Sequence, residues 1–471
     1  MNNQSPSGPS PDRQRILMVG SALALGGSER QLLATAQGLR AAGYELEIFE
    51  INEAPLEFGV EAEFWKLGIP SWRTSDFPTE RAGAADEPAA NGLAPFASLV
   101  DGIDIVGAGI ALKRLIERFR PHVVHCWSDT ANIVGGLVAA DLDVPRIVLS
   151  QRSVPPSLMG HRQAELYRDG YRRLRDRSDV VMVSNSETNG SSYEHWLDLP
   201  PGTIAVIRNG LWPHNFRVCS PDEAAKCRAR LGLPEDAPVV GAVMRFAVEK
   251  DPLLWIETAA AIAAQRPDAW FVLAGYGELD DQVRSRIAER KLGERVILPG
   301  AAADAGMIYA AMDVFLLTSL FEGLPNVLIE AQAAGRPVVA PHVGGVAEAF
   351  CHRETGLLVE QRNAASLAAA VLEILADPGW RVAAAASGPA FVADRFGAER
   401  MIAETVALYR LRAPENRKAA WMRPTSHSGM LRATASRNCK PRLPRSTTHS
   451  RRESGSSRRT WRPGAAPTPI R

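Results

Sequence analysis

Two glutamates stand eight positions apart in a stretch whose residue types suit the binding of a phosphorylated sugar. The stretch, residues 318–331, reads TSLFEGLPNVLIEA and follows the apolar run Val314–Leu317. Pro325 is of a type favoured in the first turn of a helix. We therefore expect Glu322 to lie in the loop ahead of that helix. Glu330 would lie on the helix, roughly 7–8 Å from its start at a rise of 1.5 Å per residue.

The loop between the two carboxylates predicts an anion site. Backbone N–H groups from Gly323 to Val327 open the helix, and the helix dipole favours negative charge there. The segment thus offers a carboxylate, a phosphate cradle and a second carboxylate. A nucleotide sugar presents sugar hydroxyls, diphosphate and ribose hydroxyls in the same order. Taken alone, such a pair of glutamates is more often two solvated carboxylates beside a helix, so the interpretation depends on a second feature.

That feature is a pair of cations in the stretch 239–252, VVGAVMRFAVEKDP. The apolar part predicts a strand that ends at Met244, which puts Arg245 and Lys250 on the loop at its carboxyl end. Two cations on the same rim as Glu322 are suited to neutralise a diphosphate, both in the ground state and as charge builds on a departing nucleotide. Beside an anion-binding helix start, this is the stronger interpretation of both loops.

The elements that must position these loops alternate in two series of short apolar runs and amphipathic helices. Such alternation is typical of parallel sheets with crossover helices. The predicted strands are 16–20, 46–51, 123–125, 147–150 and 180–183, then 239–243, 270–274, 296–298, 314–317, 337–340 and 357–359. We therefore expect an α/β fold of two doubly wound, Rossmann-like domains facing across a cleft, with ligands at the carboxyl ends of the strands.

Composition shifts along the chain predict the domain boundaries. Residues 1–14 are expected to be disordered, 15–217 to form the first domain, and 218–397 to form the second. Residues 77–102 are rich in Ala, Pro and Gly and predict a surface loop insertion. Residues 398–412 predict a C-terminal helix that could pack back on the first domain. Residues 413–471 predict a disordered basic tail.

Charge and composition exclude several classes of protein. The chain has 471 residues and a formal net charge of +1, but residues 413–471 carry 14 Lys/Arg against 2 Asp/Glu. The remainder is mildly acidic, so no nucleic-acid partner is expected. The start lacks the apolar stretch of a signal peptide, and no apolar run approaches the ~20 residues that span a bilayer. Five cysteines at unrelated spacings favour a reducing cytosol, so we expect a cytoplasmic protein.

Taken together, these motifs resemble the retaining GT-B glycosyltransferases of family 4. The resemblance rests on the Glu-x7-Glu pair, the Arg-x4-Lys pair, Gly26-Gly27-Ser-Glu after the first strand, the sequence PHVVH at 121–125, and Gly344-Gly345. It covers about residues 15–412 with the motifs in the expected order. It implies the GT-B fold and sugar transfer from a nucleotide sugar, with the acceptor on the side of the first domain, 15–217, and the nucleotide sugar bound by the second, 218–397.

Roles follow by position from this resemblance. Glu322 resembles the residue that contacts the donor sugar near its reacting carbon, and Glu330 the one that holds the ribose hydroxyls. Arg245 and Lys250 look like the diphosphate clamp. The other implied donor-binding residues are backbone groups of Gly26, Gly27, Gly323, Leu324, Pro325, Asn326 and Val327, together with the strand-end Gly275.

Two residues are implied on the acceptor side, and one sits where the family pattern is broken. Asn209 belongs to an Asn-Gly turn similar to the interdomain turn of the family. Many members carry a His where Arg152 stands here, so Arg152 is expected to bind the acceptor or the transferred sugar. Of the common His-x-His only His125 remains. It is either a sugar contact, with a part in catalysis, or a structural residue.

The resemblance also implies a mechanism and partners. Such enzymes retain the anomeric configuration by front-face attack, without a protein nucleophile. No metal and no cofactor are expected, because Arg245, Lys250 and a helix start take the place of a cation. UDP is the commonest donor nucleotide of the family. A glycan or lipid-linked acceptor in cell-surface polysaccharide or glycoconjugate synthesis is implied.

Three further interpretations stay open. The arginine-rich helix at 162–177 could touch an anionic membrane, which would make the protein peripheral at the inner face of the plasma membrane, or it could be a solvated basic face. A nucleotide-sugar epimerase can use the same two-domain fold. A non-catalytic nucleotide-sugar-binding subunit is the third possibility.

Overall fold

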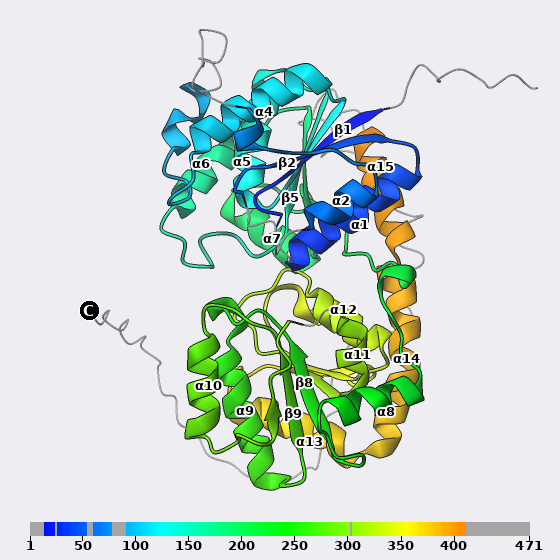
Figure 1. The fold of residues 1–471 in the computed structure, drawn as a ribbon. Coiled ribbons are helices and arrows are strands. Elements are labelled where there is room, and N and C mark those ends of the chain that lie inside the picture. Colours follow the sequence, from blue (N-terminus) through cyan, green and yellow to red (C-terminus); the bar gives the residue numbers. More distant parts are fainter. Residues whose placement is uncertain (1–13, 24–25, 54–59, 78–90, 302–303, 411–471) are drawn as a thin grey trace, which may run out of the picture. The chain divides into compact units, whose positions relative to one another are not determined.

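The computed structural model describes residues 14–23, 26–53, 60–77, 91–301 and 304–410. It contains two parallel sheets, each between layers of helices (Figure 1). The expected disordered segments 1–14 and 413–471 lie outside the described residues, except for Gln14.

The first sheet has the strand order β3-β2-β1-β4-β5-β6-β7, and its pairs are parallel. Its direction of growth reverses between β1 and β4, which is the doubly wound arrangement. The strands are β1 Arg15–Gly20, β2 Glu45–Glu50, β3 Ser71–Arg73, β4 Val123–Trp127, β5 Arg146–Gln151, β6 Val180–Ser184 and β7 Ala205–Val206.

The second sheet has the order β10-β9-β8-β11-β12-β13 and reverses between β8 and β11. Its strands are β8 Val239–Val243, β9 Trp270–Ala274, β10 Val296–Ile297, β11 Val314–Leu316, β12 Val338–Pro341 and β13 Gly356–Val359. Neighbouring strands β8 and β11 pair Val240 with Val314. The loops that follow these two strands therefore leave the sheet side by side, at the point where open α/β sheets bind ligands.

Helices cover both faces of each sheet (Figure 1). Those of the first domain are α1 Gly27–Ala41, α2 Glu61–Lys66, α4 Ile105–Phe119, α5 Asp129–Asp141, α6 Ala164–Leu174 and α7 Glu187–Trp196. Those of the second are α8 Pro221–Arg230, α9 Pro252–Gln265, α10 Asp280–Glu289, α11 Ala305–Ala310, α12 Asn326–Ala333, α13 Ala364–Ala376 and α14 Pro378–Phe396. The last helix is α15 Ala398–Arg410.

The core of the first domain follows from the alternation of side chains along its strands. On β1, Leu17 and Val19 point into the cluster that packs on α4 and α5, whereas Ile16 and Met18 point into the opposite cluster with α1. All four are fully buried. Because both faces are covered, the strands are continuous apolar runs, as parallel sheets require.

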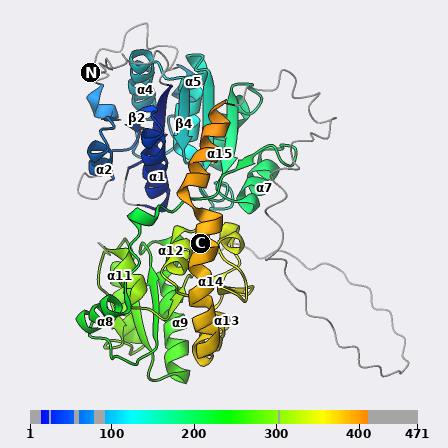
Figure 2. The ribbon, with the colours of Figure 1, turned by 90° about the vertical axis from the view of Figure 1, so that its right-hand side faces the viewer.

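The last helix adds to this second cluster. Met401, Ile402, Leu408 and Tyr409 of α15 are buried with residues of α1 and β1. Figure 2 shows α15 continuing from α14 and running beside α1. The chain therefore returns from the second domain to complete the core of the first.

Several elements were not expected from the sequence. Helices α2, α7 and α8 and the edge strand β3 were missed, although α8 carries a recognisable start signal, the capping box Ser220/Glu223. The prediction that residues 77–102 form a surface insertion is wrong for its second half: Leu93, Phe96 and Leu99 are each about 1% exposed and lie in the core beside α4. Residues 78–90 of that segment lie outside the described residues.

Candidate functional site

The loop after β8 and the loop after β11 meet at the carboxyl end of the second sheet. The ammonium of Lys250 lies 2.7 Å from Oε1 of Glu322. The backbone N–H of Leu320 donates to the carbonyl of Glu249 at 2.8 Å. The hydroxyl of Thr318 donates to the carbonyl of Lys250 at 3.1 Å. The two loops on which the predicted site depends therefore form one surface.

The loop that carries Lys250 is held in place by contacts of the next residue, Asp251. Asp251 adopts a left-handed conformation at φ 47° and caps α9, where its side chain accepts from the N–H of Leu254 at 3.0 Å. The same carboxylate pairs with Arg362, whose Nε donates to the carbonyl of Thr318 at 3.2 Å. Lys250 thus sits immediately before a capped helix that is tied to the Glu322 loop.

The carboxylate of Glu322 is nearly buried and held in place. Only 6% of the residue is exposed. Its Oε1 accepts from the hydroxyl of Ser319 at 2.6 Å and pairs with Lys250. Its backbone carbonyl accepts from the amide of Asn189, in the first domain, at 3.1 Å. A carboxylate fixed in this way is preorganised for a ligand hydroxyl, since the cost of ordering it is met before binding.

Arg245 is the more exposed member of the cation pair. Its side chain is 69% exposed and pairs with Glu249, four residues further along the chain. An exposed pair of this kind stabilises the fold by well under about 1 kcal/mol. The guanidinium can therefore leave Glu249 for a diphosphate at little cost.

Glycine at position 323 allows the first domain to approach the loop closely. A Cβ there would lie 2.1 Å from the carbonyl oxygen of Arg152. The next residues lead into α12, whose first N–H groups have no acceptor within the helix. Asn326 turns its side chain toward the other domain and donates to the carbonyl of Gly27 at 2.8 Å. The start of α12 and the Gly26–Gly27 turn therefore face each other.

The second glutamate, Glu330, is buried between partners from both domains. Its Oε2 accepts from the Tyr309 hydroxyl at 2.8 Å. Its Oε1 pairs with the guanidinium of Arg30 at 2.8 Å. Burial, followed by the Glu330 charge, raises the pKa of the Tyr309 phenol well above its ordinary value. The sequence did not indicate Arg30, because a contact between α1 and α12 depends on how two distant elements come together.

Glu29 is a second residue that the sequence analysis left without a role. It lies in the first turn of α1, and its carboxylate folds back over Gly26, where a Cβ would meet Oε2 at 2.2 Å. Burial raises the pKa of Glu29 to about 7, against the opposing effects of its own backbone N–H and then of Arg152, Arg245 and Arg30. The charges of three arginines from both domains thus act on this carboxylate.

Arg152 lies at this junction, as expected for a residue after β5. Its guanidinium donates to Oδ1 of Asn209 at 2.6 Å and lies 4.7 Å from the ring centre of Trp127. Burial lowers the pKa of Arg152 to about 10, and the nearby Glu29 opposes this shift. It remains charged at neutral pH, and its Nε has no hydrogen-bond partner.

Asn209 and Gly275 both make close contacts within the protein. The side chain of Asn209 is buried, and its amide donates to the Leu324 carbonyl at 2.8 Å and to Oδ1 of Asn326 at 2.6 Å. With Arg152 on its oxygen, Asn209 bridges the two domains, and an acceptor contact of Asn209 stays a prediction. At Gly275, with φ of 145°, a Cβ would lie 1.8 Å from the Met244 carbonyl, so this glycine serves strand packing.

Of the two alternatives for His125, a sugar contact or a structural residue, its contacts favour the structural one. It is 2% exposed. Its Nδ1 lies 2.8 Å from the Tyr409 hydroxyl and its Nε2 lies 2.7 Å from Oγ of Ser150. Burial, and to a lesser extent the charge of Arg152, lowers the pKa of His125 to about 3. A neutral ring with both nitrogens occupied leaves no atom for a substrate.

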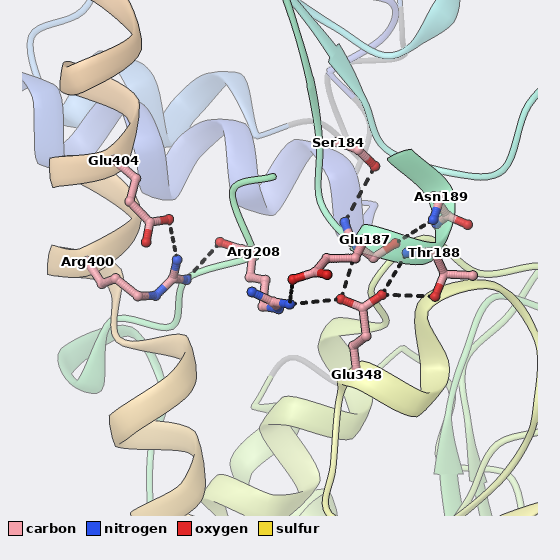
Figure 3. Close-up of polar contacts among 9 residues, drawn as sticks. Ser184, Glu187, Thr188, Asn189, Arg208, Glu348, Arg400 and Glu404 are labelled. Carbon is pink, nitrogen blue, oxygen red and sulfur yellow. Dashed lines mark hydrogen bonds and ion pairs between the residues drawn. The ribbon is translucent and has the colours of Figure 1, made fainter. Parts of the chain in front are cut away.

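A second set of polar contacts, the polar seam of Glu348, Arg208 and Arg400, ties α7 to the second domain (Figure 3). Glu348, at the end of the 3-10 helix η7 Gly344–Glu348, accepts from the backbone N–H groups of Glu187 and Thr188 at 3.0 and 2.9 Å. It also pairs with Arg208 at 3.1 Å. A carboxylate from one domain thus caps a helix of the other. Arg400 of α15 donates to the carbonyl of Arg208 at 2.9 Å and extends the seam.

The arginines of the arginine-rich segment 162–177 make contacts within the chain, and contact with an anionic membrane stays a prediction. Each of the six arginines has a partner within the chain. These contacts are Arg162 with Asp101, Arg168 and Arg172 with Asp198, Arg173 over the ring of Phe96, Arg175 with the carbonyl of Leu197, and Arg177 with Asp179. In the part of the chain that the structure describes, no helix is both long and apolar enough to cross a bilayer.

Two family models match the chain. Residues 25–213 match the model described as Glycosyltransferase Family 4, and residues 224–391 match the model described as Glycosyl transferases group 1. Together they span both domains, and the chain belongs to the family 4 (group 1) glycosyltransferases. The resemblance drawn from the sequence motifs is confirmed.

Among curated relatives, the Vi polysaccharide biosynthesis protein VipC/TviE of Salmonella typhi is 33% identical over 242 residues, which is 51% of this chain and 42% of the relative. A D-inositol 3-phosphate glycosyltransferase of Corynebacterium urealyticum is 30% identical over 53% of this chain and 61% of the relative. The chain thus matches less than two thirds of the length of either. A protein of the same name from Thermobispora bispora is 27% identical over 82% of this chain and 89% of the relative.

Solved structures share the fold. HepE of Anabaena in complex with UDP-glucose superposes with a TM-score of 0.68 at 21% identity, covering 83% of this chain and 99% of that chain. WaaG, a glycosyltransferase involved in lipopolysaccharide biosynthesis, superposes with a TM-score of 0.65 at 13% identity, covering 84% and 99%. The predicted GT-B fold, with two Rossmann-like domains, is confirmed.

Proposed function

We propose that this chain is a retaining glycosyltransferase that moves a sugar from a nucleotide sugar, in the first instance a UDP-sugar, to a glycan or lipid-linked acceptor. The observation that carries the proposal is the 2.7 Å contact between Lys250 and Glu322 at the switch point of the second sheet. It groups a buried carboxylate, two cations and a helix start where a sugar diphosphate needs them. Membership of the glycosyltransferase family supports the proposal.

Different residues would bind the sugar, the diphosphate and the ribose of the donor. Glu322 would accept hydrogen bonds from hydroxyls of the donor sugar, and the start of α12 with Arg245 and Lys250 would hold the diphosphate. Glu330, already bonded to Tyr309, would hold the ribose. In transfer, the bond from the anomeric carbon to the diphosphate breaks and a bond to the acceptor oxygen forms on the same face. The acceptor proton passes to the departing phosphate, so the protein supplies orientation and charge.

This mechanism needs neither a metal ion nor a cofactor, because Arg245 and Lys250 would stabilise the departing nucleoside diphosphate. Among the described residues, no group of three or more His, Cys, Asp or Glu side chains forms a metal site. We propose that sugar transfer continues in the presence of EDTA. Loss of transfer in EDTA, restored by Mg²⁺ or Mn²⁺, would contradict this part of the proposal.

The partner chemistry is drawn from the relatives. One relative, of Escherichia coli, is named UDP-Gal:alpha-D-GlcNAc-diphosphoundecaprenol alpha-1,3-galactosyltransferase and is 27% identical over 57% of this chain. The Vi relative is named for polysaccharide biosynthesis. We place the reaction in cell-surface polysaccharide or glycoconjugate synthesis, in the cytoplasm. A lipid-linked acceptor would bring the enzyme to the inner face of the membrane without a basic patch on α6.

The test is incubation with UDP-, GDP- and ADP-sugars, with and without a panel of glycan and lipid-linked acceptors. We expect release of one nucleoside diphosphate to rise with acceptor, and NMR of the product to show the anomeric configuration of the donor. An altered sugar on an intact donor would indicate an epimerase instead. Binding without release in the presence of every acceptor would indicate a binding subunit, and an inverted product would remove the retaining mechanism.

A further inference from the structure

The guanidinium of Arg30 occupies the carboxylate that the proposed function reserves for the donor ribose. Arg30 lies in the first domain, on α1, and its Nη1 is 2.8 Å from Oε1 of Glu330 on α12. The other oxygen of this carboxylate accepts from Tyr309. One protein group thus donates to each oxygen of the carboxylate on which the ribose is proposed to bind.

The two partners of Glu330 differ in their freedom to leave. Tyr309 is fully buried in the core of the second domain, with its ring 5.7 Å from that of Phe315. The Arg30 side chain is 38% exposed, against 7% for the side chain of Glu330. A long, partly solvated side chain can change rotamer, whereas a core tyrosine cannot. A ligand that takes Oε1 therefore displaces Arg30 and keeps Tyr309.

A displaced Arg30 stays beside the start of α12. Its backbone N–H donates to the carbonyl of Gly26 at 3.1 Å, in the first turn of α1. The adjacent Gly27 accepts from the side chain of Asn326, the first residue of α12. The backbone that carries Arg30 is thus joined to the helix start where the diphosphate is proposed to bind, and five N–H donors become available there.

From this arrangement we propose that Arg30 is a further donor-binding residue, contributed by the first domain, which passes from Glu330 to the donor diphosphate when the ribose takes its place. The inference rests on the proposed function. When the ribose binds Glu330, it would release the guanidinium of Arg30, which then binds the diphosphate. Nucleosides without phosphate would have to break the Arg30–Glu330 pair with no return contact, so the site would select nucleoside diphosphates over nucleosides.

The experiment compares calorimetric binding of UDP and of uridine to wild type, Arg30→Ala and Arg30→Lys. Arg40→Ala is the matched control, because Arg40 is exposed in the last turn of the same helix. We expect Arg30→Ala to weaken UDP binding roughly tenfold or more, the scale of a lost charge-assisted hydrogen bond. Uridine should bind Arg30→Ala as well as it binds wild type, or better. The UDP affinity of Arg30→Lys should lie between those of wild type and Arg30→Ala. The UDP affinity of Arg40→Ala should match that of wild type.

Each other outcome is decisive. UDP affinity unchanged in Arg30→Ala overturns the inference and leaves the proposed function standing. Equal losses for UDP and uridine also overturn it, because they indicate that Arg30 only supports the shape of the site. Wild-type protein that binds none of UDP, GDP and ADP overturns the proposed function, and this inference with it.

Discussion

Lys250 and Glu322 lie 2.7 Å apart although 72 positions separate them in the chain. They meet because β8 and β11 are neighbours in the second sheet and each residue follows its strand. Glu322 is 6% exposed, and its Oε1 is held by this ammonium and by the hydroxyl of Ser319. The pair therefore has two consequences, one for stability and one for catalysis.

Replacement of Lys250 by alanine should lower transfer by about 100-fold, the scale of one lost charge stabiliser at a leaving group. Arg245→Ala should have a loss of the same order, and Lys250→Arg should be milder because it keeps a cation. The measurement is kcat/KM for nucleotide release with acceptor present. Arg284→Ala is the control, since Arg284 forms a similar exposed pair with Asp280 on α10. Near-normal rates for both alanine variants would show that Arg245 and Lys250 do not stabilise the diphosphate.

Lys250→Ala should also reduce stability, because it leaves the nearly buried Glu322 carboxylate without its cation. Adding Glu322→Gln to the same chain should recover part of the loss, since a neutral amide no longer needs the ammonium. Melting temperatures of the two variants show the effect. A double variant no more stable than Lys250→Ala would mean that the pair is held by other groups.

The titration of Glu29 predicts a pH dependence of stability. Burial raises its folded pKa to about 7, above its ordinary value of 4.5. Between these values the folded chain holds a proton that the unfolded chain has lost, so this group makes stability fall as pH rises from about 4.5 to about 7. Glu29→Gln should remove that fall. Melting temperatures at pH 5 and pH 8 test it, and an equal pH response in both proteins would contradict it.

The contact between His125 and Tyr409 predicts a purely structural effect. Tyr409→Phe leaves Nδ1 of a fully buried imidazole unpaired and should cost about 1–3 kcal/mol of unfolding free energy. Because both side chains are buried and paired with each other, kcat of the folded variant should stay within about twofold of wild type, as for changes away from reacting groups. Denaturant titration and kcat at a temperature well below the transition measure the two effects. Loss of kcat without loss of stability would restore a catalytic role for His125.

Much of the fold was predictable from local pattern. Buried parallel strands are apolar runs bounded by turns, so each strand of the second sheet could be placed to within a residue or two. The neighbouring positions of the Arg245 and Glu322 loops then followed from the switch-point rule. Helix α8 was missed because its residues are mostly polar, although its capping box was present.

The part that could not be predicted lies where distant elements meet. His125 ends the strand that the sequence predicts, but β4 continues to Trp127, and α15, returning from the second domain, covers His125 with Tyr409. Arg30 and Glu348 make their contacts across the two domains. No spacing along the sequence encodes such contacts, because they depend on how two separately folded sheets pack.

Glu348 predicts a local effect in the other domain. Its carboxylate accepts from the first N–H groups of α7, at Glu187 and Thr188, and such a cap is worth about 1 kcal/mol. Glu348→Ala should therefore speed amide hydrogen exchange in the first turn of α7 about fivefold while exchange in β6 stays slow. Glu360→Ala is the control, since Glu360 is exposed and pairs only with His342 among the described residues. Unchanged exchange at α7 would mean that the domains are not held together by this carboxylate in solution.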